Sequence, residues 1–286
     1  MAAERTDEAD RRRYWSDQME NAYAFVEKMF EAPVEECGEG LSSLVQAVTN
    51  AGVHVTFSRR DHVGGHKRLY YLRAGLIDDF VGVARAMNER GWVLHVEDAF
   101  RTREMQRGLA LQDYTFDVVL ERLCWELAGR VPDGDLMLRR LAALIAPAPK
   151  VGTHMSGSAV DVSVYRRSDH KEIDRGGPYL ELSELTPMRS PFVTTAASEN
   201  RNAITEIFEH FGFAAYPYEF WHYSKGDAYE AHLHGKGGPA SYGAVDFDPT
   251  TGRVWRIDKP CEPFHSPDEI RRMIESSLRR ESKRRQ

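Results

Sequence analysis

The 286-residue sequence lacks the features that would point to a membrane, to export or to a nucleic acid. No stretch of about 18 apolar residues occurs, and no apolar segment of the signal-peptide type follows the charged start of the chain. The formal net charge is -6, so no basic excess favours nucleic acid or an anionic membrane. We expect no membrane span, no nucleic-acid partner, a small substrate and a cytoplasmic location; no pattern indicates an oligomeric state.

Cysteine is also scarce. Cys37, Cys124 and Cys261 are widely separated, without the close pairs that thiolate metal sites usually need. We therefore expect them to be reduced thiols.

Apolar residues make up 42% of the chain, which is enough for a sizeable core. Helical spacing of apolar residues predicts helices over 14–30, 72–88, 135–145 and 198–210, and a longer helical pattern reaching from Leu109 to Leu127. Strands are expected over 92–96 and 159–165, with a hairpin formed by 242–247 and 253–257. Ser266-Pro267-Asp268-Glu269 resembles a capping box that opens a C-terminal helix. A glycine- and proline-containing segment over 166–189 is expected to be a long loop bordering a substrate site.

Two segments carry the residue types of a metal site. In the first, 153–161, His154 precedes a strand in which valines alternate with polar residues, so Asp161 is expected to face a cleft. The second, 219–222, ends in His222. Two imidazoles and one carboxylate are a ligand set that leaves zinc an open coordination position. Gly157 would permit the tight path between His154 and Asp161.

Two further residues suit hydrolysis at such a site. Glu219 lies three residues before His222, close enough to accept a proton from water without binding the metal. Arg101 follows the strand at 92–96 and is the best-placed cation for a developing oxyanion. Asp98, three residues earlier, is expected to orient it.

The motifs T-H-x-x-G-S-A-V-D, E-F-W-H-Y and Asp98-Ala99-Phe100-Arg101, in this order, resemble those of the zinc-dependent D-alanyl-D-alanine dipeptidases associated with vancomycin resistance. The resemblance covers about residues 72–229. It implies one zinc ion held by His154, Asp161 and His222, with Glu219 as general base and Arg101 steadying the transition state. Asp98, Trp221 and Ser158 are expected beside the metal ligands or the substrate.

The resemblance also implies an α+β fold, with a small antiparallel sheet flanked by helices, shared with peptidoglycan carboxypeptidases and hedgehog domains. We expect a helical extension over 1–71 packed on the core, a zinc peptidase core over 72–230, and an extension over 231–286 with a hairpin and a basic helix. The chain departs from the family pattern at Gly152, where serine is usual, and at Thr102, where proline is usual. Both departures concern substrate specificity rather than metal chemistry.

Several alternatives stay open from the sequence. If extended, His232-Leu233-His234 would place two imidazoles on one face and compete with Glu219 and His222. Serines 156, 158 and 163 give only the weak pattern of a serine nucleophile. The expected reaction is hydrolysis of a small dipeptide amide, such as D-Ala-D-Ala. A related amidase or carboxypeptidase acting on a peptidoglycan fragment or specialised metabolite, and a non-catalytic zinc-stabilised binding module, are the alternatives.

Overall fold

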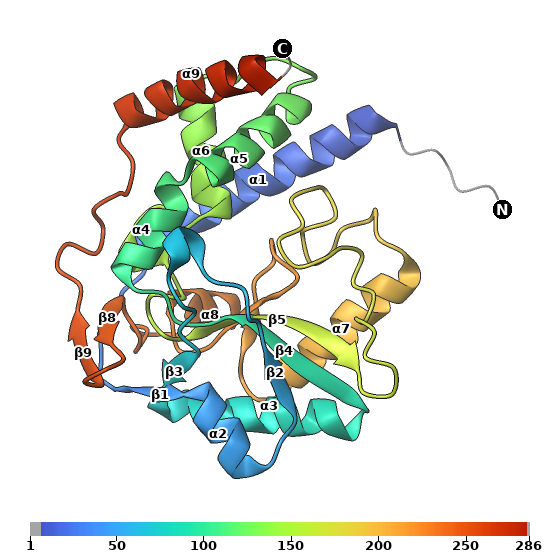
Figure 1. The fold of residues 1–286 in the computed structure, drawn as a ribbon, viewed down its shortest axis with the longest axis vertical. Helices are drawn as coiled ribbons and strands as arrows, with labels where there is room; N and C mark the ends of the chain where they lie inside the picture. The colour runs from blue at the N-terminus through green and yellow to red at the C-terminus, as the bar shows by residue number, and fades with distance from the viewer. Residues whose placement is uncertain (1–6, 285–286) are drawn as a thin grey trace.

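A five-stranded sheet in the order β2-β4-β5-β7-β6 lies at the centre of the structure, a computed structural model that describes residues 7–284 (Figure 1). Its strands are β2 (Val55–Phe57), β4 (Trp92–Asp98), β5 (Ala159–Arg166), β6 (Ala214–Ala215) and β7 (His222–Ser224). Pairing is antiparallel except between β2 and β4, which run parallel. The sheet is therefore mixed at one edge.

The register of the central strands aligns three polar residues. Asp161 of β5 lies opposite Asp98 on one side and opposite His222 on the other. An irregularity in β4 between Val96 and Asp98 brings Asp98 into this row. Directly opposed residues on neighbouring antiparallel strands have Cβ atoms about 5 Å apart, so strand pairing alone gathers these side chains.

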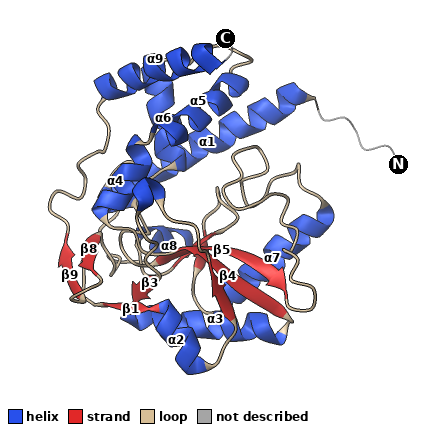
Figure 2. Ribbon diagram, in the orientation of Figure 1, coloured by secondary structure: helices blue, strands red, loops and turns tan. Residues whose placement is uncertain are grey.

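One face of the sheet packs on helices α2 (Leu44–Ala51), α3 (Ile77–Glu89) and α7 (Thr195–His210) (Figure 2). The valines of β5 enter this core with Phe80 of α3 and Phe208 of α7. Because side chains alternate along a strand, Asp161 lies on the opposite face. The alternation expected over 159–165 is thus confirmed.

Further helices form a second layer, drawn above the sheet in Figure 1. They are α1 (Glu8–Glu31), α4 (Arg103–Leu111), α5 (Asp113–Glu126), α6 (Gly134–Leu144) and α9 (Pro267–Arg284). Buried residues of α5, α6 and α9 share one apolar cluster, and α1 packs on α6 through another. The remaining elements are short: β1 (Leu41–Ser43) pairs with β3 (Tyr71–Arg73), β8 (Val245–Asp248) pairs with β9 (Arg253–Arg256), and α8 (Ala228–Leu233) follows β7.

Most of the long elements expected from the sequence are present. The capping box is confirmed: the Ser266 backbone N–H donates to the Glu269 carboxylate, and the Glu269 N–H donates to the Ser266 hydroxyl. Thr102 caps α4, since its hydroxyl accepts from the Met105 N–H at 3.2 Å. The segment 166–189 beyond β5 is a loop, and the three cysteines are free.

Three expectations about secondary structure were wrong. Residues 71–73 form a strand, and the following helix begins only at Ile77. The pattern ending at Leu127 is two helices, because Gln112 adopts an extended conformation between α4 and α5. The sheet is not purely antiparallel, since β2 joins β4 in parallel.

The segment 1–71 contains more than a helix, because it also supplies β1, α2 and β2. The division of the chain into three parts stays a prediction. Within residues 7–284, no helix combines the length and the apolar character needed to cross a membrane.

Candidate metal centre

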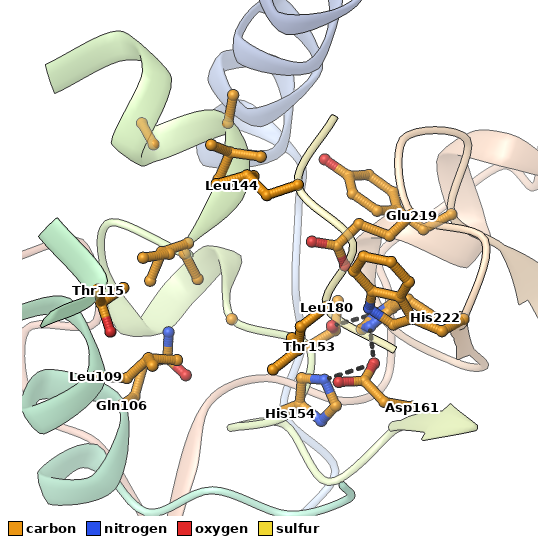
Figure 3. A pocket seen from close by; sticks show the side chains of 18 of the residues that line it. Gln106, Leu109, Thr115, Leu144, Thr153, His154, Asp161, Leu180, Glu219 and His222 are labelled. Carbon is orange, nitrogen blue, oxygen red and sulfur yellow. Dashed lines mark hydrogen bonds and ion pairs between the residues drawn. The ribbon is translucent and has the colours of Figure 1, made fainter. Parts of the chain in front are cut away.

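His154, Asp161 and His222 lie together and are buried. Their candidate ligand atoms all lie within 4.8 Å of one another, the one such group of three or more His, Cys, Asp or Glu side chains among the described residues. The Asp161 Oδ1 atom is 3.2 Å from His154 Nε2 and 2.9 Å from His222 Nδ1 (Figure 3). The three residues singled out as metal ligands thus point at one small volume.

The other nitrogen of each imidazole is held by a neighbour. His154 Nδ1 faces the carbonyl of Ala99, which can only accept a hydrogen bond, so we assign the proton to Nδ1. His222 Nε2 lies 2.9 Å from the Thr153 hydroxyl, whose oxygen can accept a hydrogen bond from the Nε2–H. These contacts leave His154 Nε2 and His222 Nδ1 unprotonated, each with an available lone pair. Metal-ligating histidines usually have this arrangement.

The donor set fits a divalent cation. With these tautomers, two nitrogen lone pairs face a carboxylate oxygen, and acceptors repel one another unless a cation or proton lies between them. Burial would raise the pKa of Asp161, but in the metal-free site protonated His154 and His222 hold it well below its usual range, so the carboxylate stays anionic. Two imidazoles and one carboxylate match the ligands of an open zinc site.

The turn that carries His154 depends on Gly157. This residue has a φ of +70°, and a Cβ built on it would lie 2.5 Å from Leu41 Cδ2. Only glycine meets both conditions without strain. The role expected of Gly157 has a clear structural basis.

Ser158 supports the same turn. Its buried hydroxyl donates to the Asp227 carboxylate and contacts the Thr153 carbonyl. Trp221, also buried, lines the cavity beside the site and packs edge-on against Tyr179, with ring centroids 5.7 Å apart.

A polar network holds Arg101 beside the candidate ligand Asp161. Its Nε donates to Asp98 at 2.8 Å, its Nη1 donates to Gln106 at 3.2 Å, and its Nη2 lies 3.5 Å from Asp161 Oδ2. Burial would lower the pKa of Arg101, but the anions Asp98 and Asp161 raise it, so the cation persists. Asp98 therefore lies where it can orient Arg101.

Tyr179, from the long loop after β5, was missed by the sequence analysis. Its hydroxyl donates to Asp161 Oδ2 at 2.9 Å. Oδ1 of the same carboxylate faces the histidines, so Tyr179 helps to present Asp161 through one oxygen. Only the folded loop brings this residue to the site.

Thr153 also had no role assigned from the sequence, although it lies within the first motif.

Glu219 lines the cavity just before β7. Burial raises the pKa of Glu219 to about 7; Asp161 adds to the rise, while His222 and Arg101 oppose it. A carboxylate that titrates near neutrality both accepts and returns a proton readily.

The competing pair at His232 and His234 does not form an extended ligand pair. His232 belongs to α8, and His234 is that helix's C-terminal cap, its Nδ1 lying 2.7 Å from Glu230. His232 instead packs its ring against Phe25.

A cavity of about 300 Å³ opens beside the site. Arg101, His154, Asp161, Glu219 and His222 line one part of it. The loop after β5 contributes to its wall, as the sequence analysis expected, and helices α4, α5 and α6 form another wall. A small molecule in this cavity would contact the candidate ligands, Arg101 and Glu219 together.

Comparison with known proteins agrees with this geometry. The family model described as D-Ala-D-Ala dipeptidase, of the M15 peptidases, matches residues 57–236. This chain belongs to the D-Ala-D-Ala dipeptidase family. The match contains both metal-site segments, Arg101 and Glu219, and it identifies the chain as a member of a family of zinc metallopeptidases.

Individual relatives are distant. The D-alanyl-D-alanine dipeptidase of Enterococcus faecium is 30% identical over 71 residues, which cover 25% of this chain and 35% of the relative, about a third of its length. The D-alanyl-D-alanine dipeptidase of Synechocystis sp. is 24% identical over 218 residues, 68% of this chain and 85% of the relative. Among solved structures, the vancomycin-resistance D,D-pentapeptidase VanY in complex with Zn(II) has 16% identity and a TM-score of 0.33, covering 63% of this chain and 85% of that one.

Proposed function

We propose that this protein hydrolyses the amide bond of a small dipeptide, D-Ala-D-Ala or a similar D-amino-acid dipeptide, with one zinc ion held by His154, Asp161 and His222. The observation that carries the proposal is the convergence of these ligands beside Arg101 and Glu219 in one cavity. Membership of the dipeptidase family supports the reaction class.

The zinc ion, when bound, would supply Lewis acidity that polarises the scissile carbonyl and acidifies water. The chain's own groups account for the remaining requirements of the reaction. Arg101, kept cationic and fixed by Asp98 and Gln106, donates to the oxyanion that develops on the carbonyl oxygen. Because the guanidinium is fixed before substrate binds, little reorganisation is needed during the reaction.

Glu219 carries the proton. As a carboxylate, it accepts a proton from the attacking water, and as a carboxylic acid it returns that proton to the nitrogen of the leaving amine. A pKa of about 7 makes both transfers accessible near neutral pH. A purely structural metal site would not require this side chain, which argues against the binding-module alternative.

Glu219→Gln tests this assignment, because it keeps the shape of the side chain and removes its basicity. We expect zinc content to match the wild type and the rate of D-alanine release from D-Ala-D-Ala to fall by at least about 100-fold. Thr115→Val, which changes a cavity-lining hydroxyl bonded to Gln112, serves as a control for general disturbance. Wild-type activity in the Glu219→Gln protein would refute the proposed base.

Substrate identity needs a panel of D,D-, L,D- and L,L-dipeptides and a peptidoglycan-derived peptide. Preference for the peptidoglycan peptide would favour the related carboxypeptidase or amidase. Bound zinc with no hydrolysis of any panel member would favour a binding module.

A further inference from the structure

The cavity beside the candidate metal centre, about 300 Å³ in volume, has one wall without charged residues. Its lining residues from α4, α5 and α6 are all uncharged, and they include Leu109, Val118 and Leu144. These three side chains are half-buried. Figure 3 shows Leu109, Thr115 and Leu144 across the cavity from His154, Asp161 and His222.

Helix α5 shows why this wall is apolar. Phe116, Leu120 and Leu123 pack into the cluster shared with α6 and α9. Val118 and Tyr114 of the same helix line the cavity instead. A helix that is apolar on two sides needs an apolar partner on each. On the other side of α5, the cavity lies where an apolar partner would pack.

The rim of the cavity is apolar as well. Tyr114 and Leu180 line the cavity and remain 71% and 63% exposed. They come from different elements, α5 and the loop after β5. Leu180 also has a φ of +65°, a backbone conformation that is costly for a bulky residue and tends to persist at functional sites. The loop therefore holds a leucine at the entrance.

Charge is confined to a few lining residues. Arg101, Asp161, Glu181 and Glu219 are the charged lining residues. A charged substituent placed among Leu109, Val118 and Leu144 would lose its water without gaining a charged partner from these helices.

We propose that the preferred substrate carries one large uncharged apolar group, the size of a leucine or phenylalanine side chain, which occupies the space between α4, α5 and α6. This inference rests on the proposed function for the position of the scissile bond. Among D-amino-acid dipeptides, the protein should prefer those with one bulky apolar residue to D-Ala-D-Ala.

The first test compares kcat/KM for D-Ala-D-Ala, D-Ala-D-Leu, D-Leu-D-Ala, D-Ala-D-Phe and D-Phe-D-Ala. At least one bulky dipeptide should exceed D-Ala-D-Ala by about 10-fold or more. Val118→Phe, which fills the space, should reduce that ratio. Val45→Phe makes the same change at an exposed site on α2 that does not line the cavity, and it should leave the ratio unchanged.

The second test measures binding without turnover. Acetohydroxamate, hexanohydroxamate and phenylacetohydroxamate are titrated calorimetrically into the zinc-loaded protein, since hydroxamates bind zinc and extend their tails away from it. Affinity should rise by about threefold to fourfold for each added methylene that enters the apolar space. Val118→Phe should remove the increase. Leu180→Ala, at an exposed position on the rim of the cavity, should weaken this increase in affinity.

The outcomes separate the two proposals. Chain-length-dependent binding without hydrolysis of any dipeptide would retain the apolar subsite and reject the peptidase function. Hydrolysis of D-Ala-D-Ala with no preference for bulky substrates and no chain-length dependence would retain the function and overturn the subsite. A zinc-loaded protein that binds no hydroxamate would also overturn the proposed apolar subsite.

Discussion

At the scale of single residues, each ligand of the candidate metal centre is held by partners on the side that faces away from the other ligands. Thr153 and the Ala99 carbonyl orient the two imidazoles, while Tyr179 and Arg101 contact the oxygen of Asp161 that faces away from the histidines. Such contacts select one tautomer and one rotamer for each ligand before metal binds. The motifs predicted which residues converge as candidate ligands. They did not predict the contact from Tyr179, because it depends on how a long loop folds back.

Thr153→Val should lower zinc affinity by about 10- to 100-fold, because His222 loses the partner that orients its ring. Competition with a chromophoric chelator measures the change. Thr115→Val removes a hydroxyl from the same cavity with no contact to a ligand and should bind zinc normally. Equal affinity in both variants would show that Thr153 does not orient His222.

His62 provides a pH-dependent contribution to stability. Burial lowers the pKa of His62 to about 4, with Arg101 adding to the effect and Asp98, 3.8 Å away, opposing it. The folded state keeps His62 neutral, while the unfolded state binds a proton below pH ~6.5. The free energy of unfolding should therefore decrease from pH 6.5 to 4, by at most about 3 kcal/mol from this group.

Urea denaturation of the metal-free protein at pH 7 and pH 4.5 measures this effect. His62→Gln should reduce the loss of stability on acidification, whereas His54→Gln, at an exposed position, should not. Identical losses in the wild type and His62→Gln would contradict the assignment.

At the scale of elements, strand register brings the site together. The alternation in β5 was visible in the sequence, and it placed Asp161 on the cleft face. Three features carried no usable local pattern. The strands β1, β2 and β3 are three residues each, which is too short for periodicity. The break at Gln112 involves neither proline nor glycine. The parallel pairing of β2 with β4 depends on packing between segments that are distant in the sequence.

Gly157→Ala tests the turn between the first two ligands. Its positive φ and the contact of a Cβ with Leu41 should together destabilise the fold by about 1–3 kcal/mol and weaken zinc binding. Gly108→Ala, inside α4 with open space around the added methyl, should instead be neutral or stabilise by up to about 1 kcal/mol. Similar effects from the two substitutions would mean that Gly157 is not conformationally required.

At the scale of the whole molecule, two layers contribute different parts of one cavity. The sheet and its loops carry the candidate metal ligands, and the helical layer supplies the apolar wall. The helical layer has its own core, in which Ile270 of α9 is fully buried. The sequence predicted most of the long helices of this layer, but their assembly beside the metal site arises from contacts between distant segments.

Ile270→Ala should lower the free energy of unfolding by about 2–5 kcal/mol through loss of packing in the helical layer. Zinc affinity at the sheet should change little. Chemical denaturation and chelator competition on the same samples measure the two properties. Glu275→Ala, at an exposed site on α9, should stay within about 0.5 kcal/mol of the wild type. A large loss of zinc affinity in Ile270→Ala would show that the layers are not separable in this way.

Zinc stoichiometry of purified variants tests the central claim most directly. The wild type and Glu219→Gln should each bind one zinc ion per chain with high affinity, whereas His154→Ala, Asp161→Ala and His222→Ala, confirmed as folded by circular dichroism, should each lose that affinity. Folded ligand variants that still bind one zinc ion as tightly as the wild type would contradict the account.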